Sequence, residues 1–189
     1  MTTVDAESQG RLLWSGEHWI AYLRDIDSDQ DTGMVSLYSA YASPAGRGTA
    51  AFVEIPGDNG FKGLCTDNVA FAEFARTQVV PSSPFDHEMP TVEAKLERDG
   101  GTRLSASWTI RTGQHEIGVS WQSLQEPLVG PTIPHPKIVF TILVFADTGS
   151  MSVDGYRVPG EPYPRQAWAA SLGKPMSSFC FALAETVIH

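Results

Sequence analysis

The sequence has little positive charge, few cysteines and no apolar run long enough to cross a membrane as a helix. Lys and Arg number 13 against 22 Asp and Glu, which leaves a net charge of −9. A field of that sign repels phosphate backbones and anionic lipid headgroups, so we expect neither nucleic acid nor a membrane as a partner. The longest apolar stretch, 138–146, covers about half of the roughly 20 residues that a transmembrane helix requires.

The sequence also lacks the common cofactor and export motifs. Cys65 and Cys180 are too few for a disulfide framework, and we expect two free, buried thiols. The first ten residues contain Asp5 and Glu7 and lack the basic start and apolar run of a secretory signal, so we expect a cytoplasmic protein. There is no glycine-rich phosphate loop, nucleophile elbow or Cys-x-x-Cys pair, and we therefore predict no cofactor.

Metal ligands are not clustered in the sequence. The acidic run 25–31 alternates like a calcium loop, but Gln30 occupies the position where that loop needs glycine. Four histidines show neither i, i+4 pairing nor close spacing to cysteine: His18, His87, His115 and His135. We predict no metal site.

Alternating apolar and polar residues predict a mostly β fold. The clearest run is 102–111, which places on one face Leu104, Ala106, Trp108 and Ile110. Together with runs at 92–96 and 117–121 and the turn signals between them, it predicts a three-stranded meander. Further strands are expected at 34–42, 49–55, 137–146, 151–158 and 177–188, with a turn at 147–149.

One longer segment has helical spacing instead. Phe71, Phe74 and Ala75 predict a helix over 68–79, capped by Thr66 or Asp67. A shorter helical turn is expected at 166–171, ended by the glycine at position 173. We therefore predict that residues 1–189 form a single antiparallel β-barrel with one main helix, because closure removes exposed sheet edges; a β-sandwich is the alternative.

The last quarter of the chain contains motifs that resemble a known group. They are Val153-Asp154-Gly155, Val158-Pro159-Gly160, Trp168 and the run 173–178 that leads into 181–185. These motifs resemble the ending of lipocalin-like barrel proteins of the carotenoid hydratase and AttH type. The resemblance implies a calycin-type barrel with an apolar ligand, and some relatives are cofactor-free enzymes. The group's paired-tryptophan opening is not matched, so no activity is carried over to individual residues.

Aromatic residues are the main candidates for a binding site. A barrel of about eight strands has room for side chains or for one small ligand. Indole N–H and phenol O–H groups can orient a ligand's oxygen inside an apolar pocket, although plain core packing is the alternative. The expected ligand-binding residues are Trp14, Trp19, Trp108, Trp121 and Tyr156, with Arg111 for a ligand carboxylate if its strand face turns inward.

Two segments next to prolines contain acid–base candidates. Asp86 and His87 lie between the expected helix and the meander, and His135 stands between two prolines. A histidine beside carboxylates can act as a general base near neutral pH, whereas a plain surface loop is the alternative. We name Asp86, His87 and His135 as the catalytic candidates.

Three functions are compatible with this pattern. The first is binding of a small hydrophobic or aromatic molecule in a barrel cavity. The second is a cofactor-independent lyase, isomerase or cyclase that acts on a terpenoid-like or polyketide-like molecule in the same cavity. The third is an interaction protein with a filled interior and an outer apolar patch. The expected partner is a small hydrophobic molecule, and the sequence leaves a homodimer open.

Overall fold

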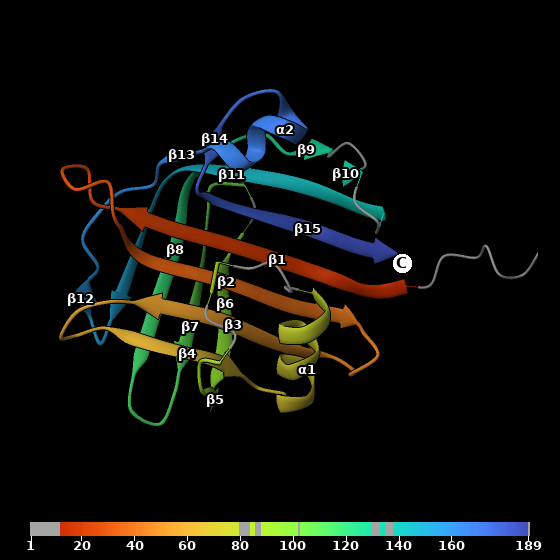
Figure 1. The fold of residues 1–189 in the computed structure, drawn as a ribbon, viewed down its shortest axis with the longest axis horizontal. Helices are drawn as coiled ribbons and strands as arrows, with labels where there is room; N and C mark the ends of the chain where they lie inside the picture. The colour runs from red at the N-terminus through yellow and green to blue at the C-terminus, as the bar shows by residue number, and fades with distance from the viewer. Residues whose placement is uncertain are drawn as a thin grey trace, which may run out of the picture.

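A computed structural model describes residues 12–79, 84–85, 88–101, 103–129, 133–134 and 138–188. Most of them belong to one sheet that curls into a nearly closed barrel, which confirms the predicted mostly-β barrel with a main helix (Figure 1). In side-by-side order its strands are β5 (Thr91–Glu93), β4 (Phe61–Thr66), β3 (Gly48–Ile55), β2 (Asp31–Ala42), β1 (Leu12–Arg24), β15 (Phe179–Ile188), β11 (Ile138–Val153), β8 (Glu116–Leu124), β7 (Ser105–Arg111) and β6 (Lys95–Gly100).

Five short strands complete the sheet structure. β9 (Leu128–Val129), β10 (Ile133–Pro134) and β12 (Tyr156–Arg157) each pair with β11. β13 (Pro164–Arg165) and β14 (Met176–Ser177) form a separate pair. No helix in the described part of the chain combines the length and the apolar character that a membrane crossing needs.

The two edges of the barrel are joined by one stretch of chain. β5 pairs in parallel with β4 at one edge, and β6, which follows after Ala94, pairs antiparallel with β7 at the other. The Ala94 N–H donates to the Thr66 carbonyl at 2.8 Å, which holds the chain against β4 as it turns. Because the same stretch serves both edges, the sheet offers few unpaired backbone groups to other chains.

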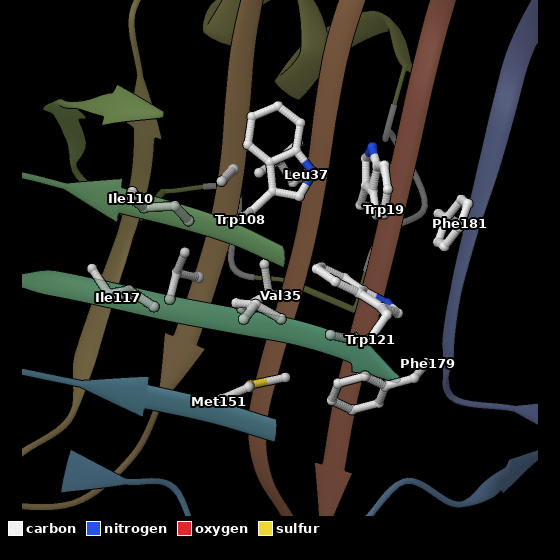
Figure 2. Packing of buried hydrophobic residues seen from close by; sticks show 14 of the residues in the cluster. Trp19, Val35, Leu37, Trp108, Ile110, Ile117, Trp121, Met151, Phe179 and Phe181 are labelled. Atoms are coloured by element: carbon white, nitrogen blue, oxygen red, sulfur yellow. The ribbon is translucent and has the colours of Figure 1, made fainter. Parts of the chain in front are cut away.

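Apolar side chains fill the barrel interior. Figure 2 shows the indoles of Trp19, Trp108 and Trp121 close to the rings of Phe179 and Phe181. Trp19 stacks on Phe181 with 4.1 Å between ring centroids, and it meets the other two indoles edge-on. Four of these rings expose no surface, namely Trp19, Trp121, Phe179 and Phe181. The space between them is therefore packed, because a cavity that water could enter would leave accessible surface on its walls.

A second apolar layer covers the outer face of the sheet. Helix α1 (Val69–Phe74) continues into the π-helical turn η2 (Ala75–Val79), so the helix predicted at 68–79 is confirmed. Figure 1 shows α1 in front of the sheet, and its buried residues Phe71 and Ala72 pack there with Phe52 of β3. The short helices η3 (Gln166–Trp168) and α2 (Ala169–Leu172) cover the outer face near β11 and β15 and confirm the second helical segment.

The main helix is capped by a different residue from the predicted ones. The Asn68 side chain accepts a hydrogen bond from the Phe71 N–H, as an N-cap does. Thr66 instead accepts from the Asn68 N–H, and Asp67 accepts from the Thr49 N–H on β3. Both predicted caps therefore hold the loop that leads into the helix.

The turn predicted at 147–149 is wrong. β11 runs without a break; its first half pairs with β15 and its second half with β8. Gly149 allows close packing instead of a turn, because a Cβ atom there would overlap the buried ring of Phe179 and the Ser120 carbonyl oxygen. A glycine in a strand often marks such a close approach.

Two single residues also depart from the predicted pattern. Leu104 was expected on the buried face of its strand but is 81% exposed, because β7 begins one residue later. In β15, strict alternation from Phe179 and Phe181 would place Val187 on the inner face, but Ala184 has a φ of 50° and Val187 packs into the outer layer. A local irregularity of this kind reverses the faces of the residues that follow.

We predict that Gly149→Ala destabilises the protein by about 1–3 kcal/mol, the usual cost of overpacking a filled core. The measurement is the free energy of unfolding in urea. The matched control is Gly113→Ala, because no atom lies within 4 Å of a Cβ placed at that position. Equal stability of the two variants would contradict the packing that we describe around Phe179.

Candidate functional site

The structure separates the expected ligand-binding residues. Trp19, Trp108 and Trp121 meet in the interior. Trp14 belongs to the outer layer, and Tyr156 on β12 is 64% exposed.

The expected charged residues are not placed in the interior either. Arg111 is exposed at the end of β7, where its guanidinium pairs with Glu97 and Glu116. A ligand carboxylate at this position would compete with both side chains. The catalytic candidates Asp86, His87 and His135 lie outside the described residues.

A buried charged cluster lies at one end of the barrel, near the start of β1. Glu17 is only 7% exposed, because strand alternation places it on the inner face with Trp19. Its carboxylate accepts hydrogen bonds from the Trp19 indole N–H at 2.9 Å and from the Tyr41 hydroxyl at 2.6 Å. Arg98 reaches across from β6 and donates to both carboxylate oxygens, at 2.8 and 2.7 Å.

These contacts account for a carboxylate in an aromatic interior. A buried charge is tolerated only where an opposite charge and hydrogen bonds replace its hydration. The Arg98 guanidinium also lies 5.8 Å from the centre of the Trp19 ring, within cation–π distance. Desolvation, together with the hydrogen bond to Glu17, raises the pKa of Tyr41 to about 12, so this hydroxyl keeps its proton and donates at neutral pH.

Polar N–H groups without an acceptor lie next to this cluster. Trp108 stands directly opposite Arg98 in the β6–β7 register and is 6% exposed. Its indole nitrogen has no hydrogen-bond partner among the described residues. Arg98 uses one terminal nitrogen for Glu17, and its side chain remains 40% exposed. Directly opposite residues of paired strands lie on the same face of the sheet, so the two side chains start from adjacent positions.

A surface hollow of about 670 Å³ adjoins the cluster. It is connected to the cluster through Ser39, which lies directly opposite Glu17 on β2. Its other lining residues come from the ends of neighbouring strands and from the start of α1 and include Thr49, Asp67 and Asn68. Glu17, Arg98 and Trp108 are not among the described residues that line the hollow.

Metal and thiol chemistry have little support at this site. Among the described residues, no three His, Cys, Asp or Glu side chains come close enough to hold a metal ion. Cys65 and Cys180 are free and buried, as predicted. Burial raises the pKa of each thiol to about 12, which disfavours the nucleophilic thiolate.

The sequence pattern did not single out Glu17 or Arg98. A signal for Glu17 was present, because a glutamate two residues before Trp19 interrupts a run that is otherwise rich in apolar residues. Arg98 gave no comparable signal, since it lies 81 residues away from its partner in the chain. Only the barrel topology brings the two together.

Replacing Arg98 by Met should destabilise the protein, because it leaves the Glu17 carboxylate buried without its counter-charge while keeping an apolar stem against Trp19. We expect a loss of about 1–3 kcal/mol, less than for a fully buried pair because Arg98 is partly exposed. Urea unfolding measures the effect. Arg111→Met is the matched control, because Arg111 pairs with the carboxylates of Glu97 and Glu116, which are both exposed. A loss as large as that of Arg98→Met would refute the role of the burial of Glu17.

Comparisons of the chain with protein-family models, with curated proteins and with solved structures find no match. The lipocalin-like resemblance of the last quarter of the chain therefore stays an expectation.

Proposed function

We propose that the protein binds a small apolar molecule carrying a neutral oxygen, such as a ketone, at the barrel end formed by Trp108, Arg98 and Glu17. The proposal keeps the expected small hydrophobic ligand but moves it from the barrel centre, where the rings are fully buried, to one end. The observation that carries it is the buried indole N–H of Trp108, which has no acceptor among the described residues.

Hydrogen bonding supports a ligand with an oxygen acceptor. Leaving a buried donor without a partner costs about 1–3 kcal/mol, and a ligand oxygen next to the Trp108 N–H would remove that cost. Arg98, directly opposite on β6, offers further N–H groups to the same oxygen. Two donors that converge on one position can fix the orientation of a ligand in an otherwise apolar setting.

The charge balance of the cluster favours a neutral ligand. Glu17 already neutralises Arg98 through two hydrogen bonds from the same guanidinium nitrogen. A ligand carboxylate near Arg98 would also come close to the buried Glu17 carboxylate, and like charges in a partly desolvated site repel. A carbonyl or hydroxyl oxygen avoids that repulsion.

Apolar side chains extend this end of the barrel towards solvent. Phe140 and Ile142 alternate along β11 with the interior residue Val144, and they are 51% and 36% exposed. These half-exposed side chains continue the aromatic interior to the surface. They would contact the apolar part of a ligand whose oxygen faces Trp108.

The test compares two probes of similar shape, acetylnaphthalene, which has a ketone oxygen, and ethylnaphthalene, which has none. Burial of the rings should give saturable quenching of tryptophan emission, with dissociation constants in about the micromolar range. The wild-type protein should bind the ketone about 3–10 times more tightly, the effect of one net hydrogen bond. Equilibrium dialysis provides the affinities of the variants.

Trp108→Phe should weaken the preference for the ketone, because it keeps an aromatic ring and removes one of the two N–H donors, while the Arg98 N–H groups remain. The matched control is Trp168→Phe, since the Trp168 indole nitrogen also lacks an acceptor but packs in the outer layer near Phe145. Equal affinities of the two probes for the wild-type protein would reject the proposal. So would a Trp108→Phe variant whose preference for the ketone equals that of the wild type.

A further inference from the structure

A second hollow, of about 510 Å³, lies beside the turn that joins β7 to β8. This hollow lies at the opposite end of the barrel from Glu17. Most of its lining residues lie at the start of β4, just after the end of β7 and just before the start of β8. Phe61 and Val92 line the hollow and also pack against the interior core, which gives it an apolar floor. His115 and Lys62 line its polar side.

His115 is held by a carboxylate and by its own turn. Its Nδ1 lies 2.8 Å from an oxygen of Asp154, which belongs to the turn between β11 and β12. The other Asp154 oxygen accepts a hydrogen bond from the Glu116 N–H at 2.8 Å. The His115 backbone is fixed as well, because its N–H donates to the Thr112 hydroxyl and its carbonyl accepts from the Thr112 N–H, each at 2.9 Å.

This arrangement leaves the second imidazole nitrogen available. Hydrogen bonds from the Glu116 N–H and from His115 lower the pKa of Asp154, so its carboxylate stays ionised and accepts the Nδ1 proton. The tautomer with its proton on Nδ1 has its lone pair on Nε2. No hydrogen bond from Nε2 to any described residue is found.

We propose that His115 and Asp154 form a general-base pair that removes a proton from the carbon next to a carbonyl group of an apolar or aromatic substrate. The substrate would lie against Phe61. The Phe61 ring meets the His115 imidazole edge-on, with 5.6 Å between the ring centroids. This site shares no residue with the barrel end around Trp108. A negative result for one proposal therefore does not bear on the other.

The chemical step needs no cofactor. Nε2 of His115 takes the proton, the electron pair of the broken C–H bond forms a carbon–carbon double bond, and the carbonyl becomes an enolate. The developing oxyanion is stabilised by positive charge nearby, which Lys62 supplies from the same hollow while pairing with Glu54 at 3.5 Å. In a substrate whose carbon–carbon double bond lies directly beyond the carbon that loses the proton, the enolate is a dienolate. Return of the proton from the imidazolium to the far carbon of that dienolate moves the double bond and gives an isomer. Asp154 stabilises the imidazolium between the two steps.

The test uses nitrobenzisoxazole, a probe that reports any competent general base in an apolar site. The base removes the ring C–H proton, the carbon–nitrogen bond becomes a nitrile, the nitrogen–oxygen bond breaks, and a coloured cyanonitrophenolate is released. The wild-type protein should accelerate this reaction saturably. His115→Ala should lower the rate at least tenfold, within the usual contribution of a general base, and Asp154→Asn should lower it by a smaller factor.

Arg157→Ala is the control, because Arg157 is exposed on β12, three residues after Asp154, and does not line the hollow. Its rate should equal that of the wild type. Thermal unfolding of each variant shows whether the fold is retained. A wild-type protein without saturable acceleration would overturn the proposal. A folded His115→Ala variant with the full rate, or an Arg157→Ala variant that loses as much, would overturn it equally.

Discussion

The ion pair between Arg98 and Glu17 ties β6, at one edge of the sheet, to β1, which lies in its middle. A sheet that curls must bring distant strands together, and here a charged contact across the barrel does so. The pair needs the Tyr41 hydroxyl and the Trp19 indole to complete the hydrogen bonding of the carboxylate. In turn it fixes the guanidinium opposite Trp108, where the unsatisfied indole N–H lies.

The packed centre of the barrel divides the molecule into two separate ends. The tryptophan and phenylalanine rings around Trp19 are fully buried, so a small molecule entering at one end does not pass to the other. One end presents N–H donors next to a neutralised ion pair. The other presents an imidazole held by a carboxylate beside an apolar floor. The first site is carried within β1, β6 and β7, and the second on strand ends and tight turns. The rigid sheet can position side chains accurately in both.

Local sequence patterns predicted those strands and helices in which one face is apolar and the other polar. Strands β7, β8 and β15 and helix α1 all have a clear period, and the structure has them. The run expected as one strand at 92–96 is instead divided at Ala94 between β5 and β6. β1 was not predicted as a strand, because Trp19 and Ala21 pack inward while Ile20 and Tyr22 pack outward. Burial on both faces removes the alternation on which strand prediction depends. Gly149 misled the prediction of β11, since a glycine needed for packing has the same sequence signal as a glycine in a turn.

The candidate sites were less predictable for a related reason. The sequence identified Trp19, Trp108 and Trp121 as aromatic, but only the register shows that they share the interior and that Tyr156 does not. Both polar pairs join residues that are far apart in the chain: 81 positions for Arg98 and Glu17, and 39 for His115 and Asp154. The first pair follows from the curl of the sheet, which brings β6 opposite β1, and the second from the pairing of β8 with β11. Local periodicity encodes neither.

We propose that the Trp108 indole N–H donates a hydrogen bond to a ligand oxygen. The NMR signal of this N–H proton tests that proposal most directly. A ¹⁵N-labelled sample has five indole N–H signals, one for each tryptophan, and single Trp→Phe variants assign them. On addition of acetylnaphthalene the Trp108 proton should move downfield, as expected when it gains a hydrogen bond, while the signals of Trp14 and Trp168 in the outer layer stay in place. An unchanged Trp108 signal at saturating probe would contradict the account, as would a shift confined to the outer-layer tryptophans.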